Sequence, residues 1–220
     1  MRFTVVDNES VIVTHLTEQI RQHADELLTR QDVKQLLEKL KETNAAVVEE
    51  VVPDVVSLGE LQRVLQGLLH EGVPIRDLGV IVEAVGDKAR VTRDPSLLAE
   101  YARQALGRTI TASHLDPEMR LRAISLDPGV EQEVAESIAQ TSDGEYLAME
   151  PARAHDLVSA LRVQTDDAVA RGSRPVLICS ARVRRHLRRL VEQSLPQLPV
   201  CSYNEIAPGI RVETIGVVNP

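Results

Sequence analysis

Aromatic residues are almost absent from this 220-residue chain, which has one Phe, three Tyr and no Trp. Its hydrophobic residues make up 43% of the sequence and are mostly Leu, Val, Ile and Ala, as in helix bundles. Cysteine is also scarce, and Cys179 with Cys201 cannot form a disulfide scaffold. No run of about 18 apolar residues occurs, so the sequence predicts no membrane-spanning helix. Nothing at the N-terminus resembles a secretory signal, and we expect a cytoplasmic, water-soluble chain.

Positive charge is in deficit as well. The chain has 25 Lys and Arg against 33 Asp and Glu, a formal net charge of -8. This balance argues against a general affinity for phosphate backbones or anionic membrane surfaces. We therefore expect neither nucleic acid nor lipid as a partner of these residues.

The first 28 residues predict one strand and one helix. Residues 2–6, "RFTVV", are typical of a short strand, and residues 10–28 carry apolar side chains at helical spacing. A single strand and helix form no core of their own. We therefore interpret residues 1–28 as the end of a subdomain whose other parts are not in this sequence.

Residues 29–110 predict an all-helical subdomain with clear boundaries. Capping boxes at Thr29/Asp32 and Ser57/Glu60 begin two helices, and "NAAVVEEVV" adds a short one that ends before Pro53. Gly72 ends the second capped helix and Pro74 is expected to begin the next, with Asp77 in its first turn. A last helix is predicted from Asp94-Pro95 to Gly107.

Residues 111–220 predict a small α/β subdomain. "MRLRAISL" and "RPVLICS" are expected strands, and helices are expected after Asp127-Pro128, over 151–170 and over 181–194. "SDG" at 142–144 indicates a turn, and "PVCSYNEI" and "IRVETIGVV" are expected as the last strands. The strand–helix–strand order over 176–203 is a βαβ unit. The predicted fold class is α+β: an all-α subdomain followed by an α/β one.

No pattern in the sequence predicts catalysis or a bound metal. The chain has no phosphate-binding G-x-x-x-x-G-K-[ST] loop, no G-x-S-x-G elbow and no H-E-x-x-H pair among its six histidines. Cys179 and Cys201 fall on neighbouring predicted strands, where a free cysteine behaves as a small hydrophobic residue. We expect a binding or scaffolding module that is not an enzyme and uses no cofactor.

The arginine-rich helix "ARVRRHLRRLVEQ" is the strongest charged feature. Its five arginines, at 182, 184, 185, 188 and 189, predict a solvated basic face opposite an apolar one. A docking face for an acidic neighbour or an adjacent subunit is the next interpretation, with Arg182, Arg185 and Arg189 as candidate contacts. A DNA-binding regulator using residues 181–193 is the third, and the acidic chain with no aromatic or amide readers beside the helix argues against it.

Arg76 is a further candidate contact. It lies in "VPIRDL", next to Asp77, and adjacent residues of a helix do not face each other. Its guanidinium is therefore expected either to stay in water at a structural corner or to reach another subdomain or a neighbouring subunit.

Long segments resemble the cytoplasmic part of the flagellar type III export-gate family FlhA, also called FHIPEP. They include "VIVTHLTEQIRQHADELL", "SLGELQRVLQGLLHEGVPIRDLGVIVEAVGD", "DPSLLAEYARQALGRTI" and "RPVLICSARVRRHLRRLVEQSLPQLPVCSYNEI". Injectisome export gates of the SctV type are paralogues of the same layout and remain an alternative. "VPIRDL", "LGRTI" and "LPVCSYNEI" favour the flagellar branch.

The resemblance implies a non-enzymatic platform. Members of the family carry an N-terminal membrane half and a cytoplasmic half of four subdomains, which forms a ring and receives export substrates with their chaperones. It also implies contacts with other parts of the export apparatus. Residues 1–28, 29–110 and 111–220 would then belong to the first, third and fourth cytoplasmic subdomains, and Met1 would be either an added start or the start of a truncated frame.

One residue of the family's chaperone site carries over. The threonine of the family's docking site matches "VTHL", which is Thr14 here. The resemblance places the other side of that site in a second subdomain that this chain lacks, so these residues alone are expected to hold only part of the chaperone site. The apolar stripe of the helix over 10–28 also lacks its expected covering, and we predict self-association through it or packing against the helical subdomain.

Overall fold

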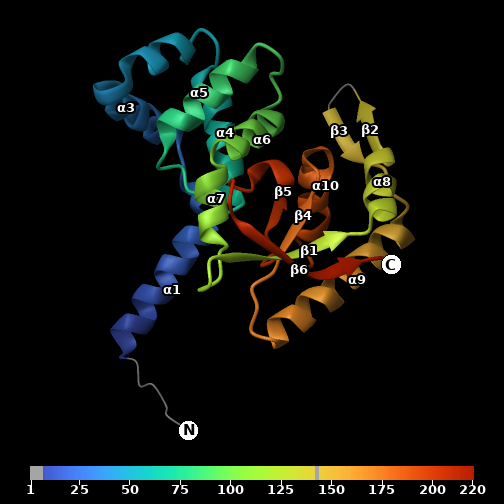
Figure 1. The fold of residues 1–220 in the computed structure, drawn as a ribbon. Helices are drawn as coiled ribbons and strands as arrows, with labels where there is room; N and C mark the ends of the chain where they lie inside the picture. The colour runs from blue at the N-terminus through green and yellow to red at the C-terminus, as the bar shows by residue number, and fades with distance from the viewer. Residues whose placement is uncertain (1–6, 142–143) are drawn as a thin grey trace. The chain divides into compact units, whose positions relative to one another are not determined.

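The computed structural model describes residues 7–141 and 144–220, and the predicted strand over 2–6 lies outside this part (Figure 1). The chain divides into two compact units, the first ending at Arg103 and the second beginning at Gln104. The α+β fold class predicted from the sequence is confirmed. None of the helices described is long and apolar enough to cross a membrane.

The first unit is helical, and its caps follow the predicted chemistry. Its helices are α1 (Asn8–Gln22), α2 (Ala24–Leu27), α3 (Arg30–Val51), α4 (Leu58–His70), α5 (Leu78–Ala89) and α6 (Pro95–Ala105). Both capping boxes are present, at Thr29/Asp32 before α3 and at Ser57/Glu60 before α4. Asn44 has non-helical angles inside α3, which separates the short helix that the sequence predicts as a distinct element.

The corner after α4 differs from its prediction. Gly72 ends the helix as expected: with φ of 70° it donates to Leu69 O, while Val73 N donates to Leu68 O. This hydrogen-bond pair is a Schellman motif, and it turns the chain out of the helix. The prediction that Pro74 begins the next helix is wrong, because residues 73–77 stay non-helical and Asp77 is the N-cap of α5 rather than a first-turn residue.

Close packing of α3 against α5 depends on a glycine. A Cβ added at Gly86 would clash with Cγ2 of Val51, whereas one at Gly79 would meet Leu40 Cδ1 at 3.6 Å, an ordinary contact. The two helices therefore approach most closely where α5 has no side chain. The core of the first unit includes Leu61, Leu65, Leu68, Ile81 and Leu98, all at 0% exposure.

The segment predicted as one helix over 10–28 is two helices. His23 has φ of -112° and separates α1 from α2. α2 is fixed to α4, because Gln66 Nε2 donates to Asp25 O at 3.1 Å and His70 Nδ1 lies 2.9 Å from Asp25 Oδ2. α1 has no buried residue, so the predicted packing of its stripe against the helical unit is wrong. The exposed apolar side chains of α1 are Val11, Ile12, Val13, Leu16 and Ile20.

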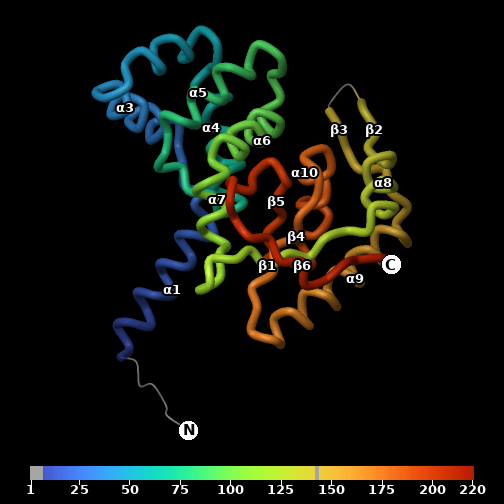
Figure 2. Tube along the Cα trace, viewed as in Figure 1, coloured from blue at the N-terminus to red at the C-terminus, as the bar shows by residue number. Residues whose placement is uncertain are grey.

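The second unit is built on a parallel sheet, and α8, α9 and α10 cover one of its faces. Its elements are α7 (Gly107–Ser113), β1 (Arg120–Leu126), α8 (Pro128–Glu136), β2 (Ile138–Thr141), β3 (Gly144–Leu147), α9 (Pro151–Ala170), β4 (Val176–Cys179), α10 (Ala181–Val191), β5 (Val200–Ser202), the 3-10 turn η1 (Tyr203–Glu205) and β6 (Arg211–Val218). The sheet has the order β5-β4-β1-β6 with every neighbouring pair parallel. Figure 2 shows α9 running beside β6.

The helix-covered face of this sheet holds one core. Ile124 and Leu126 of β1, Leu177 and Cys179 of β4, and Val218 of β6 pack with the inner side chains of α8, α9 and α10. The βαβ unit predicted over 176–203 is confirmed as β4, α10 and β5, although the last predicted strand segment keeps only three residues before η1. The described part of the chain also contains α7 and the β2–β3 hairpin, which the sequence did not predict.

The division between the units falls earlier than the predicted boundary at 110/111. α7 packs against η1, and a Cβ at Gly107 would meet Glu205 O at 2.7 Å. Thr111 Oγ1 donates to Glu205 O at 2.9 Å and accepts from Ala207 N at 3.0 Å. α7 therefore folds with the α/β unit, since both Gly107 and Thr111 contact Glu205 of η1.

We expect Gly86→Ala to destabilise the first unit, because the new methyl group overlaps Val51 at the helix crossing. Overpacking of this kind costs about 1–3 kcal/mol. Gly79→Ala is the control on the same helix, and it should be tolerated, since the added methyl group makes only an ordinary contact with Leu40. Urea unfolding followed by circular dichroism measures both, and equal stabilities would contradict the crossing described here.

We expect the exposed stripe of α1 to drive self-association. The double variant Leu16→Lys/Ile20→Lys places charge on the stripe and should remove any concentration-dependent increase in mass, measured by light scattering. His15→Lys/Gln22→Lys adds lysines at exposed positions off the stripe and should leave that increase unchanged. A native chain with constant monomer mass up to high concentration would refute the prediction.

Candidate interaction surfaces

At the carboxyl edge of the sheet, where open parallel sheets usually bind ligands, a side chain of the chain itself caps the N-terminus of α10. The backbone N–H of Ser180, at the start of α10, donates to Glu131 Oε1 at 2.8 Å. Glu131 thus takes the place that an anionic ligand occupies at a helix N-terminus. Cys179 lies just before this point at 0% exposure, and burial raises the pKa of its thiol, which disfavours a nucleophilic thiolate.

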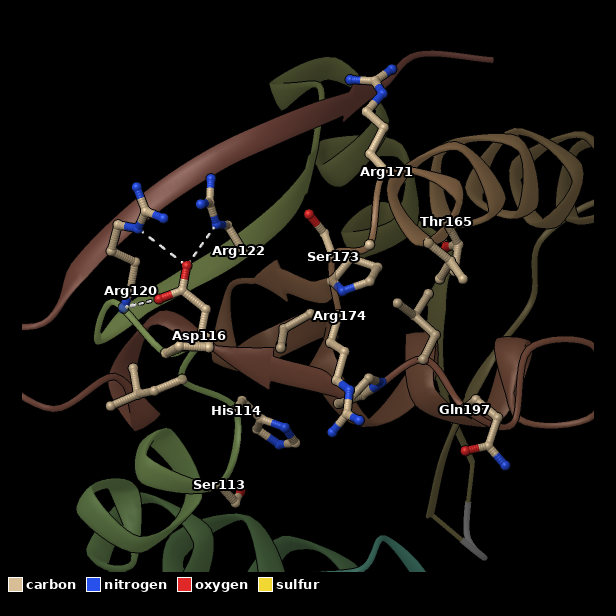
Figure 3. A pocket seen from close by; sticks show the side chains of 18 of the residues that line it. Ser113, His114, Asp116, Arg120, Arg122, Thr165, Arg171, Ser173, Arg174 and Gln197 are labelled. Atoms are coloured by element: carbon tan, nitrogen blue, oxygen red, sulfur yellow. Dashed lines mark hydrogen bonds and ion pairs between the residues drawn. The ribbon is translucent and has the colours of Figure 1, made fainter. Parts of the chain in front are cut away.

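A basin of about 1130 Å³ lies at the opposite, amino edge of the sheet (Figure 3). The starts of β1, β4 and β5 meet there, and the end of α9 and the loop after α7 complete the wall. Asp116 Oδ2 accepts from Arg120 Nε at 3.1 Å and from Arg122 Nε at 2.9 Å. Arg122 Nη1 also lies 2.6 Å from Glu213 Oε1.

Asp116 is the centre of this ion cluster. Partial burial disfavours its charged form, but the backbone N–H of Arg120 and the guanidinium groups of Arg122 and Arg120 outweigh that effect and lower its pKa to about 2. The carboxylate is therefore ionised at neutral pH. Because Asp116, Glu118 and Glu213 all pair with Arg120 or Arg122, the basin has no net cationic character from these two arginines.

The arginine-rich helix is not the solvated basic face that its sequence predicts. Arg184 is only 1% exposed, with Nη1 donating to Val200 O at 3.3 Å and Nε lying 3.8 Å from Glu205 Oε1. Glu205 is itself 1% exposed and accepts from Ser202 Oγ at 3.1 Å. Arg184 flanks the apolar stripe of α10 and is drawn into the core by a buried carboxylate, so the prediction of solvation is wrong for this residue.

Arg182 and Arg185 of α10 also make contacts within the chain. Arg185 is 6% exposed, and its Nη2 lies 2.5 Å from Glu145 Oε2 on β3. Arg182 is exposed, but its Nη2 donates to Ala135 O at the end of α8. Arg189 is exposed near the end of α10. With Arg184 and Arg185 turned inward, residues 181–193 do not present the basic face that the DNA-binding alternative requires.

Thr14 and Arg76 lie on the surface of the first unit. Thr14 is exposed, and its Oγ1 donates to Ser10 O at 2.7 Å, one turn back along α1. Arg76 is exposed in the corner between α4 and α5. The described residues hold no group of three or more His, Cys, Asp or Glu side chains suited to a metal ion.

Several polar residues that organise the second unit have no signal in the sequence. Glu145, Glu205 and Thr111 pair across 40, 21 and 94 positions respectively with Arg185, Arg184 and the backbone of Glu205. Asp116 is the exception, because its partners Arg120 and Arg122 alternate on one strand face only a few residues away. A carboxylate just before a strand with Arg at alternate positions is a pattern that could have indicated that cluster.

The arrangement defines a class of α+β protein with a helical unit and a parallel α/β unit, in which Glu131 caps the N-terminus of α10. Within this class the chain belongs to the FHIPEP family, whose sequence model matches residues 1–211.

Two kinds of relative support this membership. The flagellar biosynthesis protein FlhA of Bacillus subtilis is 42% identical over 217 residues, which cover 99% of this chain and 32% of that protein. The chain thus spans about a third of the length of the curated relatives it matches. Among solved structures, nonameric EPEC SctV-C has 28% identity and a TM-score of 0.85, covering 94% of this chain and 62% of that one. Chlamydia pneumoniae CdsV, in its complex with CdsO, has 28% identity and a TM-score of 0.88, covering 99% and 64%.

We expect Arg184→Met to destabilise the second unit by about 3–5 kcal/mol, because it leaves the Glu205 carboxylate buried without its cation. Arg189→Met removes the same charge from an exposed position of the same helix and should change stability by no more than about 0.5 kcal/mol. Urea unfolding at neutral pH compares the two. Similar losses for both variants would show that Arg184 is not the buried partner described here.

Proposed function

We propose that this chain is part of the ring-shaped cytoplasmic platform of a flagellar type III export gate, where export substrates and their chaperones dock before translocation. The observation that carries the proposal is the match to flagellar FlhA, at 42% identity over nearly the whole chain. The similarity to the SctV-C nonamer supports a ring, and the similarity to CdsV in its complex with CdsO supports contacts with other components of the export apparatus.

The proposed role is non-catalytic. Burial of the Cys179 thiol and the closure of the α10 N-terminus by Glu131 support docking rather than chemistry. Thr14, on the exposed α1, is our proposed contributor to chaperone docking. Arg185 is only 6% exposed, and contacts with neighbouring subunits or partners are therefore proposed for Arg76, Arg182 and Arg189, whose side chains are exposed.

An injectisome export gate is the second candidate, supported by the SctV-type structures at 28% identity. The higher identity to the Bacillus protein favours the flagellar role.

The experiment is a segment exchange in Bacillus subtilis. The matching 217-residue region of its FlhA is replaced by this chain, and swimming and secretion of flagellin are measured. We expect partial or full motility, because the platform surfaces of a flagellar gate would be retained. The matching region of Chlamydia CdsV is the control and should not restore motility. An equally inactive exchange, with both proteins present at normal levels, would contradict the flagellar role.

A further inference from the structure

The basin at the amino edge of the sheet lies wholly within the second unit. Its volume is about 1130 Å³, and every residue that lines it falls within Gln104–Pro220. Sites for drug-sized ligands usually enclose about 300–1,000 Å³. The basin is therefore large enough for a segment of several residues from another protein.

One wall of the basin is fixed by ion pairs. Asp116 pairs with both Arg120 and Arg122, and Glu118 pairs with Arg120. These four side chains all line the basin. Their pairing holds this wall in one conformation, so a ligand pays little to order it. It also leaves neither carboxylate without a cation of its own.

Arg174 differs from the other charged side chains of the basin. Among the Asp, Glu and Arg residues that line it, only Arg174 has no ion-pair partner in the described part of the chain, since Arg171 pairs with Asp167. Arg174 is exposed, and Figure 3 shows its guanidinium on the side of the basin that carries Gln197, away from Asp116. A charged group that enters the basin and finds an unpaired partner there is therefore an anion.

Apolar side chains line the basin together with this cation. Val169, near the end of α9, is 57% exposed, and Leu115 and Pro175 belong to the same lining. The side-chain amide of Gln197 forms no hydrogen bond with the described residues, and an amide both donates to and accepts from a peptide backbone. An apolar wall, a free amide and one unpaired guanidinium suit an extended peptide that carries apolar and acidic side chains.

The geometry points to the basin as a docking site for an extended segment of another protein, with an Asp or Glu against Arg174 and an apolar side chain against Val169. The carboxylate and the guanidinium form charge-assisted hydrogen bonds. A basic segment is not favoured, because the lining carboxylates are already paired. The inference rests on the proposed role as a docking platform only in taking a protein segment as the occupant.

The test selects peptides from a random-sequence library displayed on phage, with the intact chain as the immobilised target. Soluble Arg174→Glu chain is added in excess, so that peptides that bind elsewhere on the surface are removed. We expect peptides to survive this competition and to share an Asp or Glu near an apolar residue. Arg108→Glu makes the same charge change at an exposed position outside the basin, and as the soluble competitor it should remove these peptides as well.

The apolar contact is tested with two exposed valines of α9. Val169→Asp should weaken binding of the surviving peptides by at least about tenfold, because it replaces an apolar contact with a carboxylate that repels an acidic segment. Val163→Asp makes the same change on the same helix outside the basin and should leave binding unchanged. Thermal unfolding of each variant confirms that it is folded.

Three results would each overturn the inference: survival of no peptide, survivors that share no acidic residue, and equal binding to the native chain and to the Val169→Asp variant. Because all of these measurements use the chain alone, they are independent of motility in the segment exchange. The docking site and the flagellar role can therefore fail separately.

Discussion

The buried pair of Arg184 and Glu205 is the constraint on which the second unit depends. Both side chains are 1% exposed, and a charge removed from water is tolerated only when a partner and further hydrogen bonds compensate it. The Glu205 carboxylate accepts from Ser202, and its backbone oxygen accepts from Thr111 on α7. Elements from the beginning, middle and end of the unit therefore have to assemble together around one residue of η1.

This constraint fixes the orientation of α10, and the surface follows from it. Once Arg184 faces inward, Val183, Leu187 and Val191 enter the core, and Arg182, Arg185, His186 and Arg189 lie along the side that faces α8 and the hairpin. Arg182 stabilises the end of α8, where a cation is favoured by the helix dipole, and Arg185 holds β3. The same helix thus builds the core on one side and holds the end of α8 and β3 on the other.

Local chemistry explains which parts of the fold could be predicted from sequence. The capping boxes at Thr29 and Ser57, the glycine stop at Gly72 and the buried strand before Ser180 each depend on residues a few positions apart, and all are confirmed. Pro74 misled the prediction because proline is accepted both in a first turn and in an extended linker. The family resemblance identified the chain correctly, whereas the assignment of its subdomains and of Thr14 stays a prediction.

The site could not be predicted, because its interactions join distant residues. A helix with five arginines and a clean apolar stripe has the pattern of a solvated basic face, and only Glu205, 21 positions after Arg184, reverses that interpretation. Glu145 does the same for Arg185 across 40 positions. The β2–β3 hairpin was missed because its strands have four residues each, too few for alternation to distinguish them from a loop.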